Sequence, residues 1–180
     1  MVVPQNFPTL THDTLTVRRF RIADLDTFWA YRNDPAVAQF QGWTTPYSFE
    51  SAQQFVSEMA APDCWRAGEW TQVAIEVGGI HVGDIGLCVA GDGAEVELGF
   101  SLAVSAQGKG YASHSMRCVL AFLFASTSVQ RVVAICDSRN RASQRLLDRV
   151  HFELAATKPV DDSVFEIHYV ITRDQFSSTQ

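Results

Sequence analysis

The sequence predicts a single folded domain of the α/β (α+β) class, with helices flanking a central, mixed but mostly antiparallel sheet. Its 180 residues are 47% hydrophobic and 19% charged, a composition typical of globular domains, which excludes a disordered chain. The length favours one domain, and no repeat or linker divides the chain. Segments with alternating apolar residues and segments with helical spacing follow one another, which predicts both strands and helices.

The first part of the chain predicts a strand, two helices and a long connection. Residues 14–20 alternate apolar and polar side chains, which indicates a strand. Asp24 offers a side-chain N-cap to one helix and Ser48 offers another to a second helix. Prolines make residues 33–47 a loop-rich connection between them. We expect residues 1–13 to be a polar leader and residues 14–173 to form the folded core.

A three-stranded meander is predicted next. The apolar period changes to two over residues 70–77, 80–89 and 94–104. The two-residue turn Gly78-Gly79 separates the first two segments, and such a turn is typical of a β-hairpin.

The last third predicts two helices and three strands. Helical spacing over residues 116–124 is followed by a β-branched run over residues 129–135, so a helix crosses over to the next strand. A short helix over residues 140–150 and strands over residues 152–158 and 164–172 complete the pattern.

Charge and residue patterns exclude several classes of partner. Lys and Arg number 14 against 20 Asp and Glu, and the net charge of −6 argues against binding nucleic acid. The longest apolar run, residues 118–125, is far below the roughly 20 residues that span a bilayer, and the first 14 residues do not resemble a signal peptide. We therefore expect a cytoplasmic protein without membrane contact. The four cysteines show no metal-ligand spacing, so we expect reduced, buried thiols and no metal.

The segment from Gln107 to Ala112 is the most informative for function. It lies between a strand ending at Val104 and a predicted helix. Glycines let the backbone approach a phosphate, and the N–H groups of a helix start point towards it. Lys109 could add a positive charge. The segment matches neither a Walker A loop nor a Rossmann fingerprint, and a turn without a ligand is the alternative.

A set of motifs resembles the GNAT N-acetyltransferases. Their acyl-CoA pyrophosphate loop has Arg or Gln, two residues, Gly, one residue, then Gly or Ala, which Gln107, Gly110 and Ala112 match. Further similarities place the chain near the RimJ/RimL branch and span residues 14–173: Glu97-Leu-Gly-Phe100, Asn140-Arg-Ala-Ser143, Tyr31 to Pro35, Gly42-Trp43 and Pro46-Tyr47.

The resemblance implies acetyl-CoA as co-substrate and a split in the sheet. The pantetheine would lie between the strand ending near Val104 and the strand beginning near Arg131. The residues that it implies for acetyl-CoA binding are Val104, Gln107, Gly108, Lys109, Gly110, Tyr111, Ala112, Asn140 and Ser143. For Asn140 the alternative is a plain N-cap, and for Ser143 it is a solvent-facing position in the first turn.

Two residues are catalytic candidates for attack of a neutral amine on the thioester. Glu97 is the candidate base, acting directly or through a water, and its alternative is an exposed or structural strand residue. Many GNAT enzymes carry a tyrosine as the thiolate's acid where this chain has Leu147. Ser143 would instead hydrogen-bond the CoA sulfur. His151 replaces the family's usual glycine at the end of this helix, which costs on the order of 1–2 kcal/mol if the position is left-handed.

The acceptor is expected to be a protein N-terminal α-amine, as in the RimJ/RimL branch. Trp43 and Tyr47 are the candidate walls of its site, because loops on a rigid scaffold commonly contact substrates. Two alternatives stay open: an N-acetyltransferase for a small amine such as a polyamine, amino acid or antibiotic, and a non-catalytic acyl-CoA-binding module. A homodimer is also left open.

Overall fold

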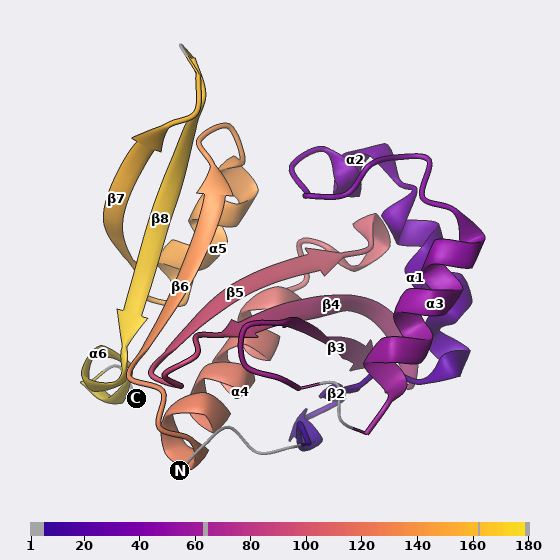
Figure 1. The fold of residues 1–180 in the computed structure, drawn as a ribbon, viewed down its shortest axis with the longest axis horizontal. Helices are drawn as coiled ribbons and strands as arrows, with labels where there is room; N and C mark the ends of the chain where they lie inside the picture. Colours follow the sequence, from indigo (N-terminus) through magenta and orange to yellow (C-terminus); the bar gives the residue numbers. More distant parts are fainter. Residues whose placement is uncertain (1–5, 63–64, 162, 179–180) are drawn as a thin grey trace.

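The computed structural model describes residues 6–62, 65–161 and 163–178, and an eight-stranded sheet forms its centre (Figure 1). The strand order is β1-β2-β3-β4-β5-β6-β8-β7, and every neighbouring pair is antiparallel except β5 and β6. The strands are β1 (Leu10–His12), β2 (Leu15–Arg19), β3 (Trp70–Val77), β4 (Ile80–Val89), β5 (Glu95–Leu102), β6 (Arg131–Asp137), β7 (Glu153–Pro159) and β8 (Phe165–Thr172). The predicted mixed, mostly antiparallel sheet is confirmed.

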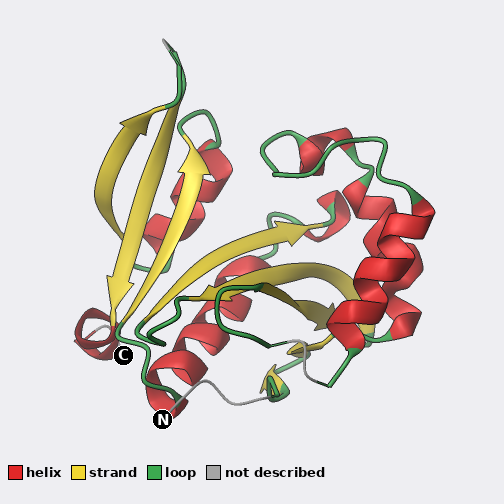
Figure 2. Cartoon of the chain, viewed as in Figure 1, coloured by secondary structure: helices red, strands yellow, loops and turns green. Residues whose placement is uncertain are grey.

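Helices cover both faces of this sheet (Figure 2). They are α1 (Leu25–Arg32), α2 (Pro35–Ala38), α3 (Phe49–Ala60), α4 (Tyr111–Ser126), α5 (Arg141–Arg149) and α6 (Arg173–Ser178), with short 3-10 turns η1 (Ile22–Asp24) and η2 (Val104–Ala106). Val73 and Ile75 of β3 pack with α4 in the larger core, whereas Ala74 packs with α1 and α3 in a smaller one. Since successive strand residues face opposite ways, α4 and the α1–α3 pair cover opposite faces.

The sheet splits between β5 and β6. The two strands pair only over Glu95–Glu97 and Arg131–Val133, and beyond these residues they diverge (Figure 2). β5 continues to Leu102 beside β4, and β6 continues to Asp137 beside β8. The divergence leaves two strand edges that face a gap. This is the split predicted between the strand ending near Val104, which in fact ends at Leu102, and the strand near Arg131.

The folded part begins before residue 14. Leu10–His12 form β1 against β2, and Phe7 is buried in the larger core beside Trp65. Residues 7 and 10–12 of the segment expected to be a polar leader therefore belong to the folded core. The expected loop between residues 33 and 47 contains the short helix α2, which begins at Pro35 and is capped by the Asp34 carboxylate.

Asp24 does not cap α1 through its side chain. Its carboxylate instead accepts two hydrogen bonds of 2.8 Å from the buried Arg18 guanidinium. The Arg18 guanidinium and the Arg21 backbone N–H lower the pKa of Asp24, outweighing the effect of burial. The ion pair with Arg18 is a stronger interaction for the Asp24 carboxylate than hydrogen bonds from the N–H groups of a helix end.

His151 ends α5 in the left-handed conformation, with φ of 68°. The Phe152 N–H donates to the Leu147 carbonyl and the His151 N–H donates to the Asp148 carbonyl, each at 3.0 Å. These two bonds define a Schellman motif, in which glycine is the usual residue. The position that the family fills with glycine is therefore strained in this chain.

The expectation of buried cysteines is only partly correct. The described cysteines Cys88, Cys118 and Cys136 are free, but only Cys136 is buried and the other two are half-buried. Cys64 lies outside the described residues. Over residues 6–62, 65–161 and 163–178, no helix is both long and apolar enough to cross a membrane.

Candidate active site between strands β5 and β6

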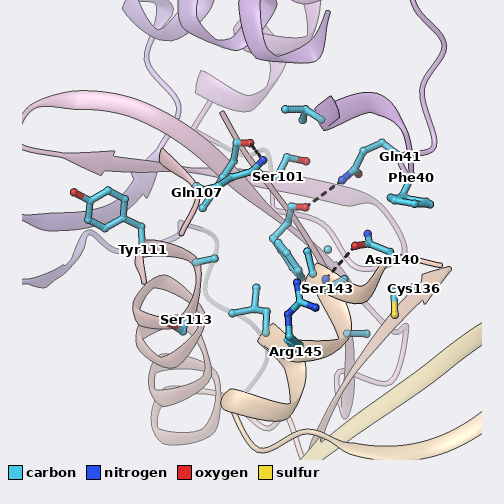
Figure 3. Close-up of a pocket in the computed structure, with 18 of the residues that line it drawn as sticks. Phe40, Gln41, Ser101, Gln107, Tyr111, Ser113, Cys136, Asn140, Ser143 and Arg145 are labelled. Atoms are coloured by element: carbon cyan, nitrogen blue, oxygen red, sulfur yellow. Dashed lines mark hydrogen bonds between the residues drawn. The ribbon is translucent and has the colours of Figure 1, made fainter. Parts of the chain in front are cut away.

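A cavity of about 640 Å³ occupies the gap between β5 and β6, a size within the usual range of ligand sites. Five parts of the chain line it: α2 with the loop after it, the end of β5, the segment from η2 into α4, the end of β6, and α5 (Figure 3). The cavity therefore joins the glycine loop and the Asn140 helix, two motifs that lie about thirty residues apart in the sequence.

The loop before α4 has the geometry of an anion site. Gly108 and Gly110 adopt φ of 73° and 83°, and no atom lies within 4 Å of where a Cβ would stand on either residue. Gly110 is the N-cap of α4, and the first N–H groups of a helix lack intrahelical partners. Backbone donors and the positive end of the helix dipole thus meet an open surface.

The structure brings most of the predicted loop residues to the cavity. Gln107, Gly108, Gly110, Tyr111 and Ala112 line it. Val104 and Lys109 are exposed and are not among its lining residues.

The charge of the lining is opposite in sign to that of the chain. Arg145 and Arg149 of α5 line the cavity, and none of the described lining residues is Asp, Glu or His. The whole chain carries a net charge of −6. A cavity lined by arginine side chains in an otherwise acidic protein fits an anionic ligand. The phosphates of CoA meet this requirement.

The free edge of β5 presents backbone groups to the gap. The Ala103 N–H donates to the Val82 carbonyl of β4, and the Ala90 N–H donates to the Glu95 carbonyl. Hydrogen-bonded pairs alternate in an antiparallel ladder, so odd-numbered residues of β5 bond to β4. The N–H and C=O groups of Leu98, Phe100 and Leu102 therefore point away from β4, and of these the Leu102 carbonyl accepts a hydrogen bond of 3.1 Å from Gln107 Nε2. An extended chain with amides, such as pantetheine, can bind there as a strand would.

The start of α5 supplies polar groups on the other side of the gap. The Asn140 Oδ1 accepts a hydrogen bond of 3.0 Å from the Ser143 N–H, so Asn140 is the helix N-cap. Ser143 is buried rather than solvent-facing, and both residues line the cavity. Burial raises the pKa of the Cys136 thiol, and the neighbouring Ser143 side chain acts in the opposite direction. Leu147, at the family's tyrosine position, is fully buried in the core.

Glu97 lies at the vertex of the split but does not line the cavity. It faces Val133 in the last pair before β5 and β6 diverge. Its side chain is on the face opposite to those of Leu98 and Phe100. Burial raises the pKa of the Glu97 carboxyl, while among its charged neighbours His168 lowers it. Glu95 and Glu166 raise the pKa further.

Trp43 and Tyr47 are not among the cavity's lining residues either. The Trp43 ring lies 3.8 Å from the guanidinium carbon of buried Arg32, and its Nε1 donates to the Arg32 carbonyl at 3.0 Å. Tyr47 packs against Phe28 in the smaller core. The aromatic residues expected to contact the acceptor therefore surround a buried arginine.

Three lining features were not predicted from the sequence: the α2 segment with Phe40 and Gln41, the arginines Arg145 and Arg149, and the thiol of Cys136. The two arginines lie four residues apart on one helix, so they share a face. That spacing is the one signal in the sequence that pointed to them. The contact of Gln41 depends on how α2 packs, which no local pattern encodes.

Comparison with known proteins identifies the family. The acetyltransferase (GNAT) domain family matches residues 14–153. The uncharacterized N-acetyltransferase p20 of Bacillus licheniformis is 24% identical over 152 residues, which cover 81% of this chain and 82% of that protein. A GNAT-family acetyltransferase from Bacillus anthracis has a similar structure, with a TM-score of 0.79 at 20% identity over 93% of this chain and 99% of that chain.

A further similar structure is RimL, a ribosomal L7/L12 α-N-protein acetyltransferase in complex with coenzyme A. Its TM-score is 0.80 at 18% identity, with 93% of this chain and 99% of that chain covered. At this identity the likeness concerns the fold. The match over residues 14–153 shows that the chain belongs to the GNAT acetyltransferase family. It is an acetyl-CoA-dependent N-acetyltransferase, and the family predicted from its motifs is confirmed.

Proposed function

We propose that the protein transfers the acetyl group of acetyl-CoA to the α-amine of a protein N-terminus. The main support for acetyl-CoA as the acetyl donor is the cavity in the sheet split. It combines an open glycine loop, two arginines and the edge of strand β5. In this proposal the loop N–H groups bind the pyrophosphate and the gap-facing groups of β5 bind the pantetheine. The second similar structure, described as an α-N-protein acetyltransferase, supports the acceptor part.

The absence of a base from the described lining of the cavity supports an α-amine. An amine attacks the thioester only when it is neutral. At pH 7 an α-amine with pKa near 8 costs about 1 kcal/mol to neutralise, whereas a lysine-like amine near 10.4 costs about 5 kcal/mol. A site without a strong base beside the thioester therefore suits the α-amine.

Glu97 is the proposed base, acting through a water. Gly99 lies on the same face of β5 as Glu97 and lines the cavity. Gly99 is the next residue on that face, roughly 6.7 Å along the strand from Glu97. Because residue 99 is glycine, it places no side chain of its own between Glu97 and the cavity, and the Trp70 ring lies 4.0 Å from where its Cβ would stand. The raised pKa of Glu97 makes it a better base than an exposed carboxylate.

Ser143 is the proposed partner of the departing thiolate. Ser143 is buried and lines the cavity, as does Cys136. Asn140 positions it by capping α5 through the Ser143 N–H. The single O–H of a hydroxyl held in this way can donate to the CoA sulfur as negative charge develops there.

The test is thiol release from acetyl-CoA with matched acceptors. We expect release with peptides that carry a free N-terminus and little release with the same peptides blocked at the N-terminus. Polyamines, free amino acids and aminoglycosides form the comparison set. Faster thiol release with a small amine than with any peptide would show that the acceptor is a small amine rather than a protein N-terminus. If no amine causes thiol release, the protein would be a non-catalytic CoA-binding module.

A further inference from the structure

Gln41 connects the α2 segment to the free edge of β5. Its Nε2 donates a hydrogen bond of 3.3 Å to the carbonyl oxygen of Phe100. That carbonyl is one of the groups that the alternation of the β4–β5 ladder directs into the gap. Gln41 is half-buried and lines the cavity, and Figure 3 shows its amide reaching into the cavity from the α2 side, with the hydrogen bond drawn as a dashed line. The side chain therefore stands over the gap itself.

Gln41 lies at the end of the cavity where the thioester is expected. In Figure 3, Gln107 and Tyr111 lie towards one end of the cavity, and Gln41, Asn140 and Ser143 lie towards the other. A donor whose pyrophosphate binds at the glycine loop extends its thioester towards the second end. This step rests on the proposed function, because it takes acetyl-CoA as the ligand.

The side-chain amide of Gln41 has a second N–H group that can donate to a ligand. A carboxamide nitrogen carries two N–H groups, and the bond to Phe100 uses one of them. No carboxylate lines the described cavity, so none there competes for the second N–H. The first bond fixes the position of the amide, which is the condition for a preorganised donor.

We propose that Gln41 is a catalytic residue that stabilises the oxyanion of the acyl-transfer reaction. The amine nitrogen forms a bond to the thioester carbon while the π electrons of the C=O bond move to oxygen, which accepts the second N–H of Gln41. Collapse restores the C=O bond and breaks the C–S bond, whose electron pair stays on sulfur. The amine proton passes to the base, and the thiolate sulfur takes up a proton from water to depart as the CoA thiol. Because the negative charge on oxygen exists only during addition, Gln41 acts mainly on the transition state.

The alternative is that Gln41 only closes the strand edge. An unpaired carbonyl on an edge strand is normally covered, and the Phe100 contact does this whether or not a thioester binds. The two roles differ in what they change. An edge cover affects the stability of the fold or the binding of pantetheine, whereas an oxyanion donor affects turnover.

The experiment compares Gln41→Met with Gln53→Met. Methionine keeps the length of glutamine but has no N–H, and Gln53 is an exposed residue of α3 that does not line the cavity. For Gln41→Met we expect kcat to fall about 10²- to 10³-fold, as for loss of one oxyanion donor. The Kd for CoA, which has no acyl carbonyl, and the melting temperature should remain near those of the wild type and of Gln53→Met.

An unchanged kcat in Gln41→Met would overturn the inference, as would a loss of kcat no greater than the loss of CoA affinity. The wild-type protein separates this failure from that of the proposed function. If the wild type releases no thiol with any amine, the proposed function fails. If the wild type turns over and Gln41→Met keeps its kcat, only the role of Gln41 is refuted.

Discussion

Replacement of Gly110 tests whether the glycine loop holds the phosphates of CoA. Gly110 has φ of 83°, and a Cβ at this position meets no atom within 4 Å. Asp and Asn are the side chains that tolerate the left-handed region best after glycine, and both are good N-caps. Gly110→Asp and Gly110→Asn should therefore both fold, each with a cost of up to about 2 kcal/mol. They differ only in charge.

The charge alone predicts a large difference in affinity. Two unit charges about 4 Å apart interact by roughly 4 kcal/mol at an effective dielectric constant near 20. With a pyrophosphate bound against the loop, that repulsion corresponds to about a 10³-fold weaker Kd for Gly110→Asp than for Gly110→Asn. The penalty should shrink as salt is added, because the loop is open to solvent.

Isothermal titration of both variants with CoA measures this difference, and thermal unfolding shows whether each variant is folded. Wild type provides the reference affinity. Equal CoA affinity in folded Gly110→Asp and Gly110→Asn would refute the phosphate site, since a carboxylate at the N-cap of α4 could not then be facing an anion.

Three further predictions concern single residues of the site and of α5. Ser143→Ala should lower turnover about 10²- to 10³-fold with nearly unchanged CoA affinity, and a variant with normal turnover and lower stability would rule out the thiolate role. His151→Gly should raise the free energy of unfolding by about 0.5–1 kcal/mol in chemical denaturation, because relief of left-handed strain exceeds the added chain entropy; an unchanged midpoint would contradict strain at this position. Glu97→Gln should depress turnover most at low pH and recover as pH rises, and a pH-independent loss would indicate positioning instead. Burial raises the pKa of Glu97 in the folded protein. Its favourable contribution to stability is therefore present below the unfolded pKa, near 4.3, and is lost as pH rises through the folded pKa. Glu97→Gln should consequently have a higher melting temperature than wild type at pH 7, but not below about pH 4.

Local patterns predicted the elements that local forces determine. Gly78 and Gly79 both have positive φ and form the turn between β3 and β4, as their two-residue spacing indicated. The Ser48 hydroxyl accepts the Ser51 N–H at 3.0 Å and caps α3. The meander and the crossover helix follow from hydrophobic periods of two and 3.6. These features can be predicted without knowing which distant segments they contact in the fold.

Features that depend on which side chains the fold brings together were not predictable. Asp24 fits the pattern of an N-cap, but the fold brings Arg18 to its carboxylate. Trp43 lies in a loop rich in turn residues, yet it packs on buried Arg32. Glu97 is different, because strand alternation alone places it on the face opposite to Phe100. That alternation can be read from the sequence, and the base role of Glu97 stays a prediction.

The acetylation of a peptide with one free α-amine and one internal lysine tests the central claim most directly. After incubation with acetyl-CoA and the protein at pH 7, fragmentation mass spectrometry locates the added acetyl group. The account predicts acetylation of the α-amine alone, with the CoA thiol released in equal amount. Acetylation of the lysine side chain would contradict it, as would release of thiol without any acetylated peptide.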